Sequence, residues 1–77
     1  MGNYRPVKTK DFRKFLEAHK CRFLGKESSH EKWKCPRCFR TITFRYIDKT
    51  IPALHLKTNL KTMGLTLKDL HSWIEEN

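Results

Sequence analysis

Acidic residues are few in this chain of 77 residues, which has eight Asp and Glu against 17 Lys and Arg and a formal net charge of +9. That balance excludes an acidic tail and indicates an anionic partner, for which nucleic acid is the leading candidate. Glycine and proline are also scarce, with three of each, and no linker, low-complexity run or internal repeat divides the chain. The length is that of one small domain, so a cofactor bound between domains is not expected.

Long hydrophobic runs and cysteines are equally rare. No stretch approaches the roughly 18–20 apolar residues that a membrane span needs, and no targeting segment is visible. The three cysteines are an odd number, which argues against a secreted module held together by disulfides. We therefore predict a cytoplasmic protein that does not associate with membranes.

The positive charge is concentrated in the first fifty residues. Residues 1–26 hold eight basic and two acidic side chains, residues 27–50 hold six and three, and residues 51–77 hold three of each. Apolar residues are interleaved with the charge throughout the basic part. The charge is therefore expected on a folded surface rather than in a disordered tail.

Residues 1–77 are predicted to form a single domain in which residues 1–8 are a loose N-terminal arm. An apolar stripe at spacings of three and four residues predicts a first helix, capped by Thr9 and ending near Lys20. The stripe consists of Phe12, Phe15, Leu16 and His19.

Three strands are expected after this helix. The first covers residues 21–24, and the other two are predicted by alternating polarity over residues 30–34 and 41–46. Pro36 lies between the second and third strands and suits a turn, because it fixes the backbone angle that common turns require. Residues 30–46 are therefore predicted to form a hairpin.

Two helices complete the predicted fold. Leu56, Leu60 and Met63 repeat at helical spacing before Gly64, and Thr66 then caps a last helix. The apolar stripe of that last helix consists of Leu67, Leu70, Trp73 and Ile74. The order α-β-β-β-α-α predicts an α+β fold, a two-layer sandwich of a three-stranded antiparallel sheet with helices on one face.

The alternation separates a core face of the sheet from an open face. The core face is expected to carry Trp33, Ile42, Phe44 and Tyr46. The open face is expected to carry His30, Lys32, Lys34, Thr41, Thr43 and Arg45.

Lys and Arg side chains bind phosphates, and histidine can take up and return a proton near neutral pH. RNA brings its own nucleophile, the 2′-OH, so a general base and a cation suffice for cleavage without a metal or cofactor. The other interpretation is a solvated strand face.

The segment from Ser28 to Pro36 resembles the Gly-Ser-His-x-x-Tyr-x-His-Pro segment of HicA-type toxins, small RNA-cleaving proteins of bacterial toxin–antitoxin pairs. Residues 9–16 resemble the opening helix of that family, and residues 63–66, Met-Gly-Leu-Thr, resemble its Ala-Gly-Leu-Thr junction. The similarity extends over residues 7–74. In this chain Ser28 replaces a glycine of the family, Trp33 its tyrosine and Cys35 its second histidine, while Glu31 replaces a position that is often basic and is expected to weaken attraction for phosphate.

The resemblance implies a double-stranded-RNA-binding-like fold, ribosome-independent mRNA cleavage and a HicB-type antitoxin as protein partner. It places His30 at the catalytic position of the family. The residues expected to bind the RNA backbone are Lys26, Lys32, Lys34, Arg40 and Arg45. The predicted function is thus that of an endoribonuclease toxin. The alternative is a non-catalytic RNA-binding module with the same fold.

Other clusters suggest further hypotheses. Cys35 and Cys38 form half of a zinc-ribbon motif, which would need two more ligands, and His19, Cys21 and His30 are the candidates. A zinc-dependent nucleic-acid adaptor is therefore a third hypothesis, although two thiols flanking a turn are the preferred interpretation. His19 ends a helix and is expected to be structural. His55 or His71 would be a second proton-transfer group only if folding brought it near His30. The aromatic residues on strands are expected in the core.

Overall fold

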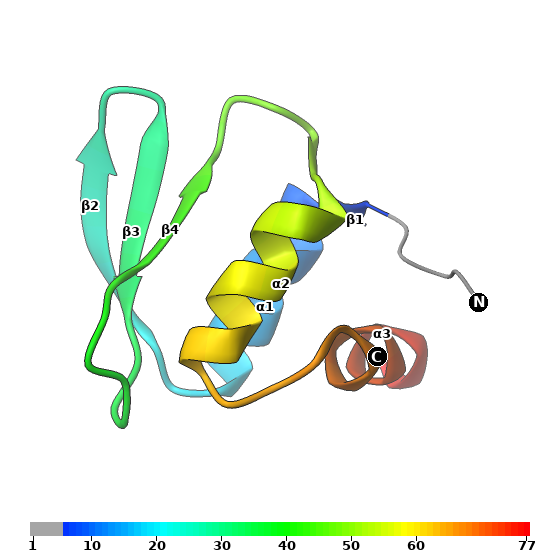
Figure 1. The fold of residues 1–77 in the computed structure, drawn as a ribbon. Coiled ribbons are helices and arrows are strands. Elements are labelled where there is room, and N and C mark those ends of the chain that lie inside the picture. The colour runs from blue at the N-terminus through cyan, green and yellow to red at the C-terminus, as the bar shows by residue number, and fades with distance from the viewer. Residues whose placement is uncertain (1–5) are drawn as a thin grey trace.

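Within residues 6–77, which the structure describes, this computed structural model has five short strands and three helices (Figure 1). In chain order they are β1 (Val7–Lys8), α1 (Thr9–Ala18), β2 (Arg22–Glu27), β3 (His30–Lys34), β4 (Ile42–Arg45), β5 (Thr50–Ile51), α2 (Ala53–Thr62) and α3 (Leu67–Glu76). Of the predicted loose arm, residues 1–5 lie outside the described part, and residues 7 and 8 form a strand instead. None of the helices in residues 6–77 is long and apolar enough to cross a membrane.

The predicted three-stranded antiparallel sheet is present, with the strand order β2-β3-β4. A second sheet, in which β1 pairs with β5, was not predicted. Each of its strands has only two residues, which is too short to produce an alternating pattern. Val7 lies opposite Ile51 and both side chains are buried, so the small sheet attaches the start of the chain to the core.

Strand β2 continues past Gly25, where the sequence pattern predicted its end. The register between β2 and β3 shifts between Phe23 and Gly25, which marks a β-bulge. Gly25 has a φ of 142°, a conformation that side chains disfavour and glycine adopts readily. Because a bulge adds one residue to a strand, it interrupts the alternation from which strands are recognised.

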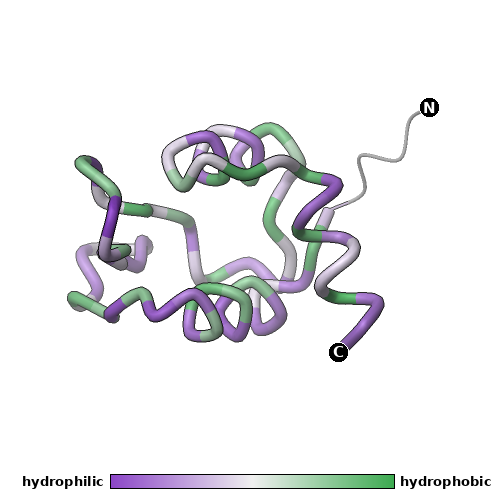
Figure 2. Tube along the Cα trace, turned by 90° about the horizontal axis from the view of Figure 1, so that it is seen from below, coloured by the Kyte–Doolittle hydropathy of each residue, from purple (hydrophilic) through white to green (hydrophobic). Residues whose placement is uncertain are grey.

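Helix α1 contacts the three-stranded sheet through Phe12 and Arg13, α2 lies against β4, and α3 packs against α1 and α2. The rings of Phe12 in α1 and Phe44 in β4 meet edge to face, with centroids 5.2 Å apart. Phe15 meets Trp73 of α3 in the same way at 5.5 Å. In Figures 1 and 2, α1 and α2 lie between the three-stranded sheet and α3. Figure 2 shows hydrophobic and hydrophilic residues alternating along the helices. Helix α3 therefore lies outside the two predicted layers, on the side of α1 and α2 that faces away from the sheet.

The ends of the helices test the predicted caps. Thr66 caps α3 through a reciprocal capping box with Asp69, as predicted, and Gly64 follows α2 with a φ of 75°. The cap of α1 is Lys8, one residue before the predicted Thr9. The Thr9 hydroxyl is engaged elsewhere, because it donates a hydrogen bond to the carbonyl oxygen of Asp48 at 2.7 Å. This contact fixes the start of α1 to the loop that follows β4.

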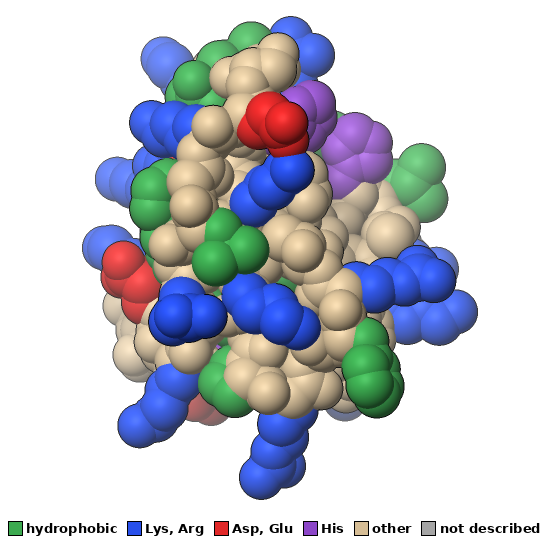
Figure 3. All heavy atoms as spheres, turned by 90° about the vertical axis from the view of Figure 1, so that its left-hand side faces the viewer, with side chains coloured by type: hydrophobic (Ala, Val, Ile, Leu, Met, Phe, Trp, Pro, Cys, Tyr) green, Lys and Arg blue, Asp and Glu red, His purple; other side chains and the backbone are tan. Residues whose placement is uncertain are grey.

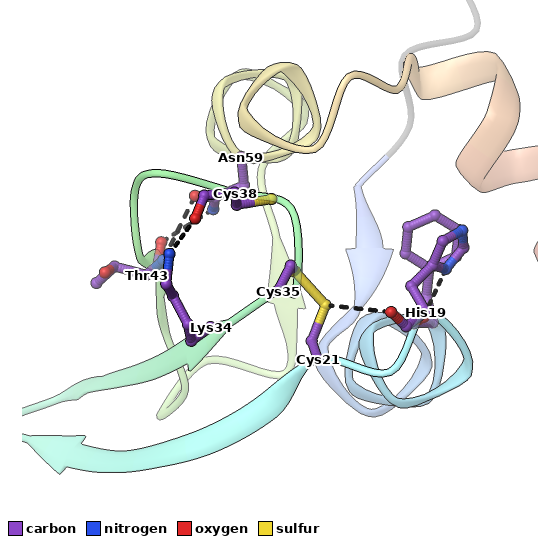
Figure 4. The surroundings of a disulfide bond; sticks show 8 residues. His19, Cys21, Lys34, Cys35, Cys38, Thr43 and Asn59 are labelled. Carbon is purple, nitrogen blue, oxygen red and sulfur yellow. Dashed lines mark hydrogen bonds between the residues drawn. A yellow bond between two sulfur atoms is a disulfide. The ribbon is translucent and has the colours of Figure 1, made fainter.

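A disulfide joins Cys21 to Cys35, and the thiol of Cys38 is free. The bond connects the chain just after α1 to the residue that follows β3 (Figure 4). The preferred interpretation of Cys35 and Cys38 as two thiols flanking a turn is therefore wrong for Cys35. One pair forms because folding brings Cys21 and Cys35 together in the core, where both are buried, while the third cysteine is left over.

Reducing this disulfide is expected to lower the free energy of unfolding by about 3 kcal/mol. The bond closes a loop with a sequence separation of 14, and a loop of that length removes about this much chain entropy from the unfolded state. Urea denaturation with and without a reductant measures the difference. Cys38→Ser is the control, and the effect of the reductant should persist in it. Equal stability under both conditions would contradict the expectation.

Candidate nucleic-acid interface

The open face of the sheet forms as the alternation predicted. On β3 and β4 the side chains of Trp33, Ile42 and Phe44 are buried, whereas those of His30 and Arg45 are exposed. The residues predicted for this face are His30, Lys32, Lys34, Thr41, Thr43 and Arg45. Lys32 and Lys34 are half-buried and the other four are exposed. The sheet therefore turns its polar side away from α1.

His30 is the first residue of β3, the central strand, and lies at the end of the sheet next to the turn of residues 28–29. It is directly opposite Glu27 on β2 and Arg45 on β4. Residues paired in this way have Cβ atoms about 5 Å apart, so their side chains are neighbours. The imidazole is thus placed between a carboxylate and a guanidinium on a solvent-exposed surface.

Two exposed ion pairs surround His30. Lys32 pairs with Glu27, and Arg45 Nε lies 3.2 Å from Asp48 Oδ2. The hydrogen bond from Lys32, together with its charge, lowers the pKa of the Glu27 carboxyl below its ordinary value of 4.5. Glu27 is therefore a carboxylate at neutral pH. Exposed ion pairs of this kind are weak, so a phosphate group can replace the carboxylate partner of either cation.

The predicted RNA-binding cations do not all lie on this face. Lys26 is opposite Glu31, and its ammonium group lies 4.4 Å from the centroid of the Tyr46 ring, on the face that carries the core residues. Arg40 precedes β4 and so lies at the end of the strand away from Arg45. The structure therefore brings Lys32 and Arg45 close to His30, but not Lys26 or Arg40.

Lys34 and Arg22 form the far end of the same face. Lys34 donates a hydrogen bond to the carbonyl oxygen of Cys38, which holds the turn after β3 against the strand (Figure 4). Arg22 lies opposite Lys34 and is exposed, so it extends the basic surface. The sequence pattern missed Arg22, because its side of the sheet depends on the register that the bulge in β2 sets.

Glu31 does not belong to the open face, although it was expected to weaken the attraction for phosphate there. Its side chain is buried and accepts hydrogen bonds from Arg13 Nε at 2.8 Å and from Trp33 Nε1 at 3.0 Å. Burial raises the pKa of this carboxyl, but the hydrogen bonds and nearby positive charges outweigh burial and lower it. Glu31 therefore attaches β3 to α1 and keeps the adjacent His30 on the outer surface.

Aromatic side chains are only partly in the core. Trp33 and Phe44 are buried as predicted, but Phe23 is half-exposed, with its ring edge to face against Trp33. Phe39, in the loop before β4, is fully exposed. Exposed aromatic rings are the type of surface on which unpaired bases stack; Phe39 precedes β4, and Phe23 lies on the side of the sheet that carries Trp33.

The described residues offer no metal site. Among residues 6–77, no three His, Cys, Asp or Glu side chains are grouped so that they could hold a metal ion. Cys35, half of the suggested zinc motif, forms the disulfide with Cys21 instead. The zinc hypothesis therefore has no support in this part of the chain.

The other histidines lie on helices or at a helix end. His19 follows α1, and its ring nitrogen Nδ1 is 3.0 Å from the carbonyl oxygen of Phe15, which agrees with the predicted structural role. His71 is in α3, on the far side of α1 and α2 from the sheet. His55 is exposed on the first turn of α2, the helix that lies along β4.

Figure 3 views the molecule from the side of the sheet. Lys and Arg side chains lie around this whole surface, and two histidine side chains lie next to each other in its upper part, close to an acidic side chain. The chain matches no protein-family model, and no curated protein or solved structure shows significant similarity to it.

Proposed function

We propose that this chain is a small endoribonuclease toxin similar to the HicA-type proteins and that it cleaves mRNA with His30 as general base. The observation that carries the proposal is the position of His30, exposed on the central strand at one end of the basic sheet face and directly opposite Arg45. A proton acceptor and a cation are thus side by side on two paired strands, and these are the two groups that cleavage by the 2′-OH requires.

The chemistry follows from these two groups. The His30 imidazole takes the proton from a 2′-OH, and the 2′-oxygen forms a bond to the adjacent phosphorus. The bond from phosphorus to the 5′-oxygen breaks and this oxygen takes up one proton, which leaves a 2′,3′-cyclic phosphate on one fragment and a 5′-OH on the other. Arg45 binds the non-bridging oxygens and stabilises the charge that develops on them. Lys32, with Lys34 and Arg22 further along the face, holds the backbone of the RNA strand.

Two local features support the resemblance to the HicA family. Ser28 has a φ of 60°, in the left-handed region that glycine favours, and it stands where the family has glycine. Trp33, at the position of the family's tyrosine, is buried and bonded to Glu31. The strand that carries His30 thus begins at a tight turn, and the buried Trp33 anchors the same strand to the core. The family's double-stranded-RNA-binding-like fold, HicB-type antitoxin and cytoplasmic location are part of the proposal.

The purified protein is expected to cleave an end-labelled RNA oligonucleotide in the presence of EDTA and to produce 2′,3′-cyclic phosphate ends. The same oligonucleotide made entirely of 2′-deoxynucleotides should bind and remain intact, because it lacks the nucleophile. Gel electrophoresis of the products, with mass spectrometry of their ends, measures both results. Salt-dependent binding of RNA without any product after prolonged incubation would contradict cleavage and identify a non-catalytic binding module.

A further inference from the structure

Helix α2 lies along the outer edge of β4, where a side chain completes the backbone pairing. Asn59 Nδ2 donates a hydrogen bond to the carbonyl oxygen of Thr43 at 2.9 Å, and Thr43 N donates to Asn59 Oδ1 at 3.4 Å (Figure 4). Asn59 is buried. These two bonds fix the position of α2 along the strand.

The helix runs antiparallel to β4. Thr58, Lys61 and Thr62 in the second half of α2 line one surface depression with Phe39 and Arg40, which precede β4. The end of α2 is therefore next to the start of β4, and Figure 1 shows the two elements running in opposite directions. It follows that the first turn of α2 is beside the end of β4.

This arrangement places His55 beside Arg45. His55 is four residues before Asn59, on the same side of the helix and about 6 Å along its axis. Arg45 is two residues after Thr43, on the same side of the strand and about 7 Å along it. Because the two elements are antiparallel, both displacements point the same way. Arg45 is also opposite His30, so His30, Arg45 and His55 follow one another from β3 across β4 to α2.

We propose that His55 is the general acid of the cleavage reaction, an inference that rests on the proposed function. A phosphodiester bound at Arg45 has an imidazole on either side. His30 takes the proton from the 2′-OH, and protonated His55 gives its proton to the departing 5′-oxygen as the bond from phosphorus to that oxygen breaks. One proton is accepted and one is delivered, so water restores the starting charges after the products leave.

The test uses two substrates with one cleavable linkage each, an ordinary RNA and the same RNA with sulfur in place of the 5′-oxygen that departs. A thiolate leaves without being protonated, so only the ordinary linkage needs an acid. His55→Ala is expected to slow cleavage of the ordinary linkage by about 100-fold or more, as for loss of a general acid, and to cleave the sulfur linkage at nearly the wild-type rate. His30→Ala should be slow on both.

His19→Ala is the matched control, because it removes another exposed imidazole that lies near Cys35, at the opposite end of β3 from His30. It should cleave both substrates like the wild type. His55 is exposed, so an unfolding midpoint equal to that of the wild type is expected to confirm that His55→Ala is folded. If His55→Ala cleaves the ordinary linkage at the wild-type rate, or loses the same factor on both linkages, the role of His55 is overturned and the proposed function is not. A wild-type protein that cleaves neither substrate would instead overturn the proposed function.

Discussion

Replacing His30 with alanine is expected to reduce the rate of RNA cleavage by at least about 100-fold while the protein remains folded and still binds RNA. General base catalysis by a positioned side chain contributes about 10²–10⁴-fold to a rate, and no other imidazole lies opposite Arg45 on the sheet of the described chain. The side chain of His30 is exposed, so its removal leaves the core intact. Single-turnover rates on an end-labelled RNA give the loss, and circular dichroism confirms the fold.

The same pair of proteins can be compared in bacteria. Expression of the wild-type chain should arrest growth and degrade mRNA, and expression of His30→Ala should do neither. Thr43→Ala, which changes another exposed residue of the open face, should behave like the wild type. Undiminished cleavage by folded His30→Ala would eliminate the proposed mechanism.

Replacing Arg13 with alanine is expected to lower the free energy of unfolding by about 3 kcal/mol. The substitution leaves the Glu31 carboxylate buried without its cation, and breaking a buried ion pair from one side costs about 3–5 kcal/mol. Because the Arg13 side chain is 37% exposed, we expect the lower end of that range. A domain of this size is stabilised by roughly 4–12 kcal/mol in total. Urea denaturation at neutral pH measures the loss.

The pH dependence of stability provides a second measurement of the same pair. The pKa of Glu31 is lowered in the folded protein, so its ionisation stabilises the fold above the ordinary value of 4.5, and this stabilisation is lost as the pH falls through the folded pKa. Without Arg13, burial raises that pKa, and stability should begin to fall at a higher pH. Lys14→Ala, an exposed cation on the same helix, is the control. Equal stability of the two variants would contradict the buried ion pair.

Local features of the sequence predict the elements of this fold because each depends on neighbouring residues. Each of three patterns involves residues only a few positions apart: the helical stripe that contains Phe12 and Phe15, the capping box at Thr66 and the alternation around Trp33. The same alternation places His30 and Arg45 on one face. The pairing that puts them directly opposite each other also follows once the hairpin is predicted.

The features that the sequence does not predict depend on how distant segments pack. Glu31 is recognisable as a core-facing residue of its strand, but its partner Arg13 comes from α1, which must first pack on the sheet. Cys21 and Cys35 meet for the same reason. The position of His55 depends on the direction in which α2 crosses the edge of β4, and Asn59, a polar residue inside a helix, is the one local sign of that contact.

The hydrogen bonds from Asn59 have a consequence for self-association. They occupy both backbone groups of Thr43, so an incoming strand cannot pair with β4 there. Within residues 6–77, Asn59 thus covers part of the β4 edge of the three-stranded sheet, and β2 forms the opposite edge. A bulge and the charged residue Lys26 interrupt that edge, and both features discourage strand addition. Both edges of the three-stranded sheet are therefore protected against pairing with a strand of another molecule, β4 by a side chain of α2 and β2 by its bulge and charge.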